Sequence, residues 1–194
     1  MTSAAVVHRV PRFVAGDVLR WSAAASVLVA TAAYGFVGFA LFMLVLGGMV
    51  LPRAFRAPAV LDLSLGVTLL VAAWAAELDW YVAVGWLDVV VHAAATGLIA
   101  AVTTLSLVGL GVLSPVDDPR LARPRLTCAV VTAGLGVALA TVWELLEWGG
   151  HTLLDDRIQV GYTDTMGDLA AGSAGAVVAA VLLSRGVLLA GRGR

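Results

Sequence analysis

Apolar residues fill long stretches of the chain, and short polar links separate these stretches. The apolar runs cover residues 14–51, 59–77, 88–113, 126–149 and 165–189. An α-helix rises about 1.5 Å per residue, so a run of about 20 apolar residues crosses the hydrocarbon core of a bilayer. Each of the last four runs fits one such helix. The pattern therefore predicts an all-α, polytopic transmembrane helix bundle.

The run 14–51 is too long for one upright helix and short for two. Arginines lie at the ends of the runs in four groups: Arg9, Arg12 and Arg20; Arg53 and Arg56; Arg120, Arg123 and Arg125; and Arg185, Arg192 and Arg194. The positive-inside rule puts all four groups in the cytoplasm. An even number of crossings must then precede Arg53.

We therefore expect 14–51 to form a helical hairpin that turns near "YGFVG", residues 34–38. Six helices result, with both termini in the cytoplasm and only Arg157 among the arginines outside. One long tilted helix over the same run, with an outer N-terminus and five helices in all, is the alternative. The whole chain, 1–194, is then a single multi-pass domain of the cytoplasmic membrane, with a four-helix core at 59–189 beside the hairpin.

Composition supports the membrane assignment and narrows the classes of function. The chain is 61% hydrophobic and only 13% charged, whereas a soluble domain carries about 25% charged residues. The net charge of −1 argues against a nucleic-acid partner. A single cysteine, Cys128, excludes an internal disulfide and a thiolate metal cage. The small residues of "AAGSAGA", 170–176, are typical of close helix packing.

Ionisable residues interrupt the apolar runs near the ends that the topology places outside. Asp88 and His92 are four residues apart, as are Asp164 and Asp168, while Glu144 and Glu147 are three apart, so each pair shares one helix face. The same ends carry Glu77, Tyr81 and His151. We expect every ionisable group embedded in the last four runs to lie near this outer face, where four helices would form one polar site.

The clustered carboxylates need a counter-charge, because an ionised side chain deep in a bilayer costs at least about 2.5–3.5 kcal/mol. The chain has no lysine, and Arg157 is the one arginine on that side. Protonation would neutralise some carboxylates, and a divalent cation would neutralise them together. Oxygen ligands with one or two imidazoles suit Mg²⁺, Mn²⁺, Zn²⁺ or Fe²⁺.

The sequence thus assigns three sets of candidate residues. The metal ligands are His92, Glu144, Glu147, Asp164 and Asp168. The catalytic candidates are Glu144, Asp168 and Asp88, and the remaining polar residues are Glu77, Tyr81 and His151. Simpler interpretations stay open: Asp88 and Asp164 suit helix N-caps, Glu77 and His151 suit the water interface, and one backbone carbonyl could satisfy His92.

Several motifs carry a resemblance to a known family. "LPRAFRAP", "AELDWYVAVGWLDVVVH", "WELLEW" and "YTDTMGDLAAGSAGA" occur in the order found in YjdF-like bacterial inner-membrane proteins, which are similar in outline to VanZ-like proteins. The resemblance covers about 52–176, and its most specific elements are W-E-x-x-E and D-T-x-x-D-L. It implies an inner-membrane helix bundle and supports the polar site, but it names no reaction.

Two classes of function fit these observations best. The first is a metal-dependent membrane enzyme that acts on a lipid or lipid-linked envelope substrate at the outer face. The second is a transporter coupled to protons or cations. Further alternatives are a non-catalytic small subunit of a larger membrane complex and a membrane terpene cyclase that uses a protonated carboxylate as its acid. An oligomer of this chain also fits the sequence. The sequence alone leaves open whether the protein is an enzyme.

Overall fold

The computed structural model describes residues 13–189, in which every regular element is a helix and no strand is present. The elements are α1 (Gly16–Ala54), α2 (Ala59–Glu77), α3 (Trp80–Ala83), α4 (Gly85–Gly109), α5 (Pro124–Leu153), α6 (Tyr162–Ser184) and the 3₁₀ turn η1 (Val187–Leu189). By length and composition, α1, α2, α4, α5 and α6 are all able to cross a membrane. The predicted all-α membrane bundle is confirmed.

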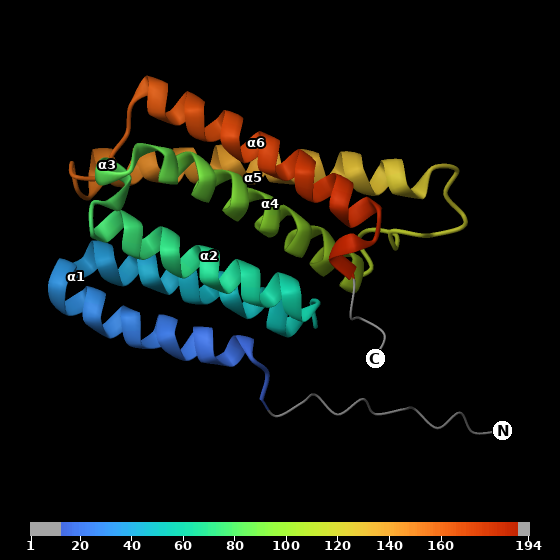
Figure 1. Cartoon of the computed structure of the whole chain (residues 1–194), viewed down its shortest axis with the longest axis horizontal. Coiled ribbons are helices and arrows are strands. Elements are labelled where there is room, and N and C mark those ends of the chain that lie inside the picture. Colours follow the sequence, from blue (N-terminus) through green and yellow to red (C-terminus); the bar gives the residue numbers. More distant parts are fainter. Residues whose placement is uncertain (1–12, 190–194) are drawn as a thin grey trace.

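Helix α1 is a hairpin rather than one rod. Gly35 has φ 68° and ψ −141°, a backbone conformation that only glycine adopts without strain. The chain doubles back there (Figure 1), and Arg20 Nε donates a hydrogen bond to the Met49 carbonyl at 2.9 Å. Gly35 divides α1 into limbs 16–34 and 36–54, each about 28 Å long at 1.5 Å per residue. The predicted hairpin is confirmed, and its turn lies within the expected "YGFVG".

The start of α1 and the end of α6 lie at the same end of the bundle (Figure 1), as an even number of crossings requires. We call this the inner end, because the arginine distribution predicts that it faces the cytoplasm. The opposite end is called the outer end. Four of the arginines behind that prediction, Arg9, Arg12, Arg192 and Arg194, lie outside the described residues.

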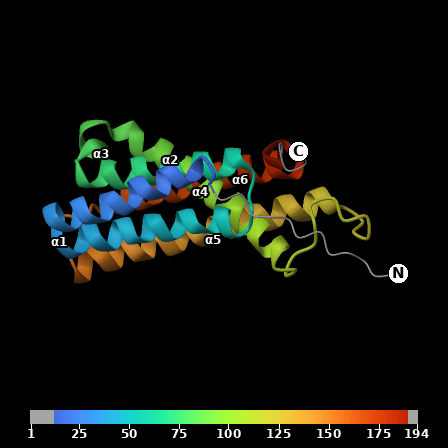
Figure 2. The same cartoon turned by 90° about the horizontal axis from the view of Figure 1, so that it is seen from below.

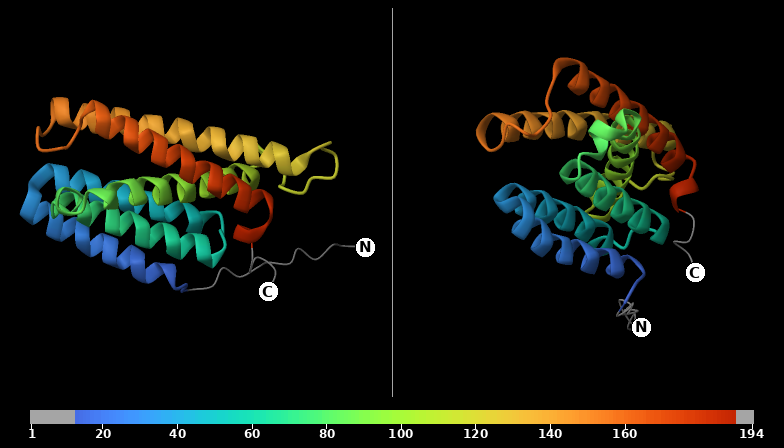
Figure 3. Two further views of the ribbon diagram at one scale, coloured as in Figure 1. Left: turned by 45° about the horizontal axis from the view of Figure 1, so that its top comes forward. Right: turned by 60° about the vertical axis from the view of Figure 1, so that its left-hand side comes forward.

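Helix α4 joins the two halves of the bundle. It packs against α5 and α6 on one side and α2 on the other, while the α1 hairpin packs mainly on α2. Figure 3 shows this order of layers, and Figure 2 shows the two limbs of α1 running side by side. One core cluster links α2, α4, α5 and α6 around Leu61, Leu105 and Leu183; another joins α1 to α2 around Phe42 and Met49.

Small residues set the spacing between α4, α5 and α6. A Cβ atom at Gly175 would overlap the backbone carbonyl of Ala93, and one at Gly97 would lie 2.7 Å from the carbonyl oxygen of Gly175. A Cβ at Gly136 would overlap the Ala176 side chain. Lipid tails are as apolar as these helices, so close van der Waals contact rather than hydrophobic burial favours their association. The small-residue motif at 170–176 therefore serves close packing.

An ionic cluster at the inner end contradicts one expectation. Arg20 pairs with Asp62 of α2 and with Asp17, at 3.0 Å for the latter pair, and Arg53 lies 3.5 Å from the same Asp17. Asp62 stands in the apolar run 59–77 and is 9% exposed. The expectation that every ionisable group of the last four runs lies at the outer face is wrong for Asp62, because Arg20 of the hairpin neutralises it at the opposite end.

Candidate functional site

Three helices bring five ionisable side chains together near the outer end of the bundle. Asp88 and His92 lie one turn apart on α4, Glu144 and Glu147 share a face of α5, and Asp168 comes from α6. Glu144 is 8% exposed and Asp168 is 5% exposed. The close α4–α6 crossing at Gly175 and Ala93 places His92 and Asp168 opposite each other, because Ala93 follows His92 directly.

The Nδ1 atom of His92 faces oxygen atoms only. It lies 3.0 Å from Asp88 Oδ1, 3.2 Å from Asp168 Oδ1, and 3.2 Å from the backbone carbonyl of Asp88. All of these atoms accept hydrogen bonds from a ring N–H when the carboxylates are ionised. When both carboxylates are ionised, Nδ1 carries the ring proton, and the acceptors from α4 and α6 fix the orientation of the ring.

The other ring nitrogen, Nε2, faces α5. It lies 3.8 Å from Glu144 Oε1, which is too long for a direct hydrogen bond. The ligand atoms of His92, Glu144 and Glu147 all lie within 4.8 Å of one another, a separation that a shared ion can bridge. A second group with the same property consists of Asp88, His92 and Asp168. His92 belongs to both groups, so it is the centre of the site.

These groups match the chemistry of metal ligation by histidine. A ligating imidazole commonly binds the ion through one nitrogen and donates its other N–H to a carboxylate, which fixes the tautomer. In this site Asp88 and Asp168 lie beside Nδ1, and Glu144 lies on the Nε2 side. Glu147 is close enough to His92 and Glu144 to add a further ligand. A zinc ion lies about 2.0–2.2 Å from nitrogen and oxygen ligands, so two of its ligands lie at most about 4.4 Å apart. Ligand atoms at the 4.8 Å limit of these groups would therefore have to move slightly closer to bind zinc.

Tyr81, in the short helix α3, closes the site on the side of α2. Its hydroxyl donates a hydrogen bond to the Ala72 carbonyl at 3.1 Å. Burial raises the pKa of Tyr81, and the carboxylates of Asp88, Glu147 and Asp168 raise it further. The phenol therefore stays protonated.

The remaining predicted residues lie around the five-residue cluster. Asp164 is exposed and lines an open outer pocket with His151, whose Nδ1 lies 2.6 Å from the Ile158 carbonyl. Glu77 has one buried oxygen without a hydrogen-bond partner in residues 13–189 and interacts electrostatically with Arg157. Neither Asp164, His151 nor Glu77 belongs to a group that could hold an ion within the described part of the chain.

Arg157 does not neutralise the cluster. Its guanidinium lies 2.6 Å from Asp155 in the same outer loop and holds the pKa of Asp155 at about 2. The ion pairs among residues 13–189 give none of the four clustered carboxylates an arginine partner. Their positively charged neighbour is at most the single imidazole of His92.

Sequence reasoning missed the residue that lies directly beneath the cluster. Thr96 of α4 is buried, and its hydroxyl lies against the α6 backbone at Gly172, where an added Cβ would be 2.8 Å from Oγ1. A threonine in an apolar helix does not stand out in the sequence, because it is neither charged nor rare there. Thr96 follows His92 by one turn and so shares its helix face, which is the one signal that could have identified it.

The fold and the site together define a polytopic helical membrane protein with an intramembrane carboxylate and histidine cluster. The chain belongs to a family described as predicted membrane protein (DUF2238), whose model matches residues 8–187. YjdF-like proteins are a DUF2238 family, so the match confirms the resemblance read from the motifs. Neither a curated protein nor a solved structure matches the chain.

Proposed function

We propose that the protein binds a divalent cation on the Nε2 side of His92. We further propose that it acts on a lipid or lipid-linked envelope substrate at the outer face of the cytoplasmic membrane. The observation that carries this proposal is the charge of the cluster: four carboxylates from three helices surround one imidazole. Buried carboxylates without a cation would have to take up protons, whereas an ion satisfies them together.

The two sides of His92 give its neighbours different roles. Glu144 and Glu147 are the proposed first ligands with Nε2, and the 3.8 Å gap between Nε2 and Glu144 Oε1 suits an intervening ion better than a direct bond. Asp88 and Asp168 hold the Nδ1 proton and orient the ring. A cation held in such a site would lower the pKa of a water molecule bound to it, or would polarise a phosphoryl or carbonyl oxygen of the substrate.

The surroundings of the cluster support a lipid substrate. The site lies within helices apolar enough to cross a membrane, so a water-soluble substrate would have to enter the bilayer to reach it. On the same helices, Trp86, Leu145 and Trp148 are 67%, 60% and 57% exposed and present large apolar surfaces outward. A lipid could approach the cluster along these side chains without leaving the membrane.

Transport is the second candidate, because buried hydroxyls continue from the cluster toward the inner end. Thr104 donates a hydrogen bond to Thr132 at 3.1 Å, and both side chains are buried. A layer of small apolar residues separates this pair from Thr96, however. Here a Cβ at Gly136 would overlap Ala176 and lie 3.0 Å from the Ala100 Cβ. This packing leaves no room for water between the two hydroxyl levels, which favours a site open to one side only.

Metal analysis of the purified protein tests the proposal. We expect one tightly held divalent ion per chain in the wild type, and its loss in both Glu144→Gln and Glu147→Gln, each of which removes one charged ligand. Glu77→Gln is the matched control, because Glu77 is a glutamate in the same half of the bundle outside both ion-binding groups. Retention of the ion by the Glu144→Gln, Glu147→Gln double variant would contradict the assignment of these ligands.

A flux assay separates the enzyme from the transporter. In proteoliposomes, we expect no metal-dependent proton or cation flux, and we expect the Ala100→Gly variant, which loosens the small-residue layer, to change this little. A steady flux that disappears in Glu144→Gln would favour transport. Lipid hydrolysis or transfer that requires the ion and disappears in the same variant would favour the enzyme.

A further inference from the structure

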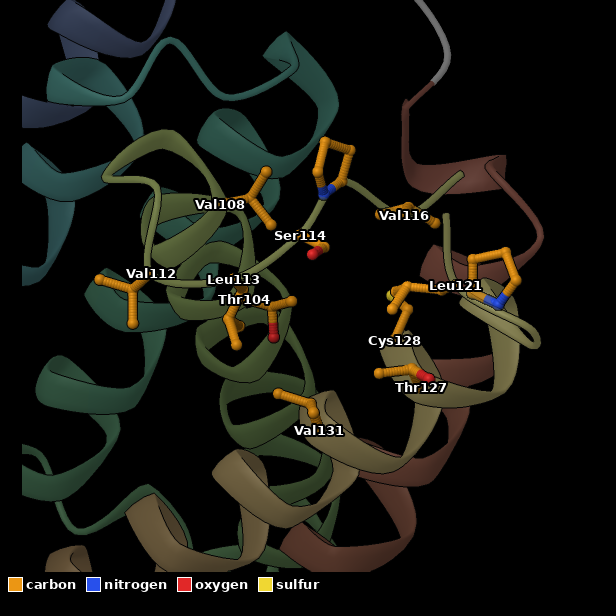
Figure 4. Close-up of a pocket in the computed structure, with 12 residues that line it drawn as sticks. Thr104, Val108, Val112, Leu113, Ser114, Val116, Leu121, Thr127, Cys128 and Val131 are labelled. Atoms are coloured by element: carbon orange, nitrogen blue, oxygen red, sulfur yellow. The ribbon is translucent and has the colours of Figure 1, made fainter. Parts of the chain in front are cut away.

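A cavity of about 220 Å³ lies at the inner end, between the last turns of α4 and the first turns of α5 (Figure 4). The loop that joins the two helices covers it. Its walls are mostly apolar and include Val108, Val112, Leu113, Leu121 and Val131. Cys128, Thr104 and Thr127 add weakly polar surface. The cavity is far from the carboxylate cluster, which lies at the opposite end of the same helices.

The size and lining of the cavity indicate what kind of molecule it suits. It is smaller than the roughly 300–1,000 Å³ of pockets that enclose a small-molecule ligand. Its walls offer few hydrogen-bonding groups, so a polar molecule entering it would lose hydration without replacement. A flexible hydrocarbon chain fits both the small volume and the apolar walls. One segment of it would fill the cavity, and the rest would lie along the outside of the helix bundle.

Two arginines adjoin a lining residue of the cavity in the chain. Pro124 lines the cavity and begins α5, and its two neighbours in the chain are Arg123 and Arg125, both exposed. Among residues 13–189 no ion pair is formed by either arginine. Arg120 differs, because it pairs with Asp118 at 2.9 Å and holds the pKa of that carboxyl at about 2.

The start of α5 adds a second source of positive potential. Its N-cap, Arg123, provides no side-chain cap. The first amide of this helix to bond back is that of Thr127, to the Arg123 carbonyl at 3.0 Å. The amides of Arg125 and Leu126 precede it and point out of the helix start, where they and the helix dipole favour an anion.

We propose that this cavity holds a segment of one acyl chain of an anionic phospholipid, whose phosphate lies against Arg123, Arg125 and the start of α5. The apolar walls select the hydrocarbon, and the two arginines with the free amides select the negative headgroup. Basic pockets between transmembrane helices recognise anionic lipids in this way. The site needs neither the metal nor the substrate of the proposed function.

Cys128 provides the probe, because it is the only cysteine of the chain and lines the cavity. The experiment measures the rate of Cys128 alkylation by N-ethylmaleimide in detergent-purified protein. Phosphatidylglycerol and phosphatidylcholine with the same acyl chains are added in parallel, and inorganic phosphate alone is a third arm. We expect phosphatidylglycerol to slow alkylation at concentrations at which phosphatidylcholine and inorganic phosphate do not.

Variants connect that protection to the named groups. Arg123→Gln and Arg125→Gln should each raise the phosphatidylglycerol concentration for half-protection about fivefold, as removal of one charge near a lipid headgroup predicts. Arg56→Gln is the matched control, since Arg56 is an exposed arginine at the same end in the link between α1 and α2, and it should change nothing. Val131→Trp, which fills the cavity, should reduce the phosphatidylglycerol retained in native mass spectrometry.

Two results would overturn the proposal. One is equal protection by phosphatidylglycerol and phosphatidylcholine, or by neither. The other is unchanged protection in both Arg123→Gln and Arg125→Gln. Circular dichroism and a melting temperature like those of the wild type show that each variant is folded, so that a loss of protection reports binding and not unfolding.

Discussion

Buried charges are balanced at the inner end of the bundle and unbalanced at the outer end. At the inner end, Arg20 and Arg53 face Asp17 and Asp62, so two cations meet two anions. At the outer end, His92 is the one basic side chain among four carboxylates. The balanced cluster is complete as it stands and ties the α1 hairpin to α2. The acidic cluster is unbalanced without protons or a cation, and this imbalance is the basis of the ion site proposed there.

The comparison also extends to geometry. The inner cluster joins the hairpin to α2 through direct contacts, including the hydrogen bond from Arg20 to the Met49 carbonyl at 2.9 Å. The outer cluster contains a 3.8 Å separation between His92 Nε2 and Glu144 Oε1, with both groups held by rigid helices. At 3.8 Å these two groups form no direct hydrogen bond. The ion proposed above would lie in this gap.

The largest expected effect comes from breaking the balanced cluster. Arg20→Gln leaves Asp62 buried without a cation, and we expect a loss of about 3–5 kcal/mol in unfolding free energy. The measurement is denaturation in detergent followed by circular dichroism. The Arg20→Met, Asp62→Leu double variant should lose less, because no uncompensated charge remains. A loss below 1 kcal/mol in Arg20→Gln would show that water reaches Asp62.

The next effect concerns the acidic cluster and its proposed ion. Addition of Zn²⁺ or Mn²⁺ at about 100 times its dissociation constant should stabilise the wild type by about 2.7 kcal/mol. A chelator should reverse the increase. Glu147→Gln should abolish it, whereas the Arg20→Met, Asp62→Leu variant should keep it, because the inner cluster binds no ion. An equal increase in Glu147→Gln would place the ion elsewhere.

A smaller effect is expected from the packing that holds the acidic cluster in place. Gly175→Ala introduces a Cβ that overlaps the Ala93 carbonyl, so α4 and α6 must separate, at about 1–3 kcal/mol. The separation also moves His92 away from Asp168, so ion binding should weaken together with the melting temperature. Gly134→Ala is the control: nothing lies within 4 Å of its Cβ, and we expect unchanged or slightly higher stability.

The smallest effect is expected at the turn of the hairpin. Gly35→Ala places a Cβ on a residue with φ 68°, which costs about 1–2 kcal/mol through backbone strain. Ion binding at the outer cluster should be unaffected, because α1 packs mainly on α2. The control is Gly47→Ala, in the second limb, where a Cβ also meets nothing within 4 Å and no positive φ is required. Equal melting temperatures for the two variants would contradict the strain argument.

The membrane fold could be predicted closely, and the site only partly. The run 59–77 coincides with α2, and the run 126–149 lies inside α5, which extends from Pro124 to Leu153. Spacing identified Asp88, His92, Glu144, Glu147 and Asp168 as candidate residues, and the structure places these five together. Spacing could not exclude Asp164 from the site, because Asp164 precedes Asp168 by four residues just as Asp88 precedes His92. In the structure Asp164 lines the open outer pocket instead.

Some contacts had no local signal at all. Asp62 and Arg20 are 42 residues apart, and nothing in the neighbourhood of either residue in the sequence points to the other. The short helix α3, which positions Tyr81, replaces a stretch that the hydrophobic pattern left as a link. These features depend on how far each helix is rotated and tilted against its neighbours, and the hydrophobic period of one helix does not fix that.

The sequence by itself identified the segments long and apolar enough to enter the membrane and the helix ends that carry acidic groups, and it favoured a first segment that doubles back. Hydrophobicity, arginine placement and glycine's backbone freedom are properties of short stretches and act wherever those stretches lie. Only the tertiary structure decided that His92 lies among carboxylates from three helices and that Asp62 pairs with Arg20. Those outcomes require side chains from separate helices to approach within a few ångströms, and packing across the small-residue interfaces sets that approach.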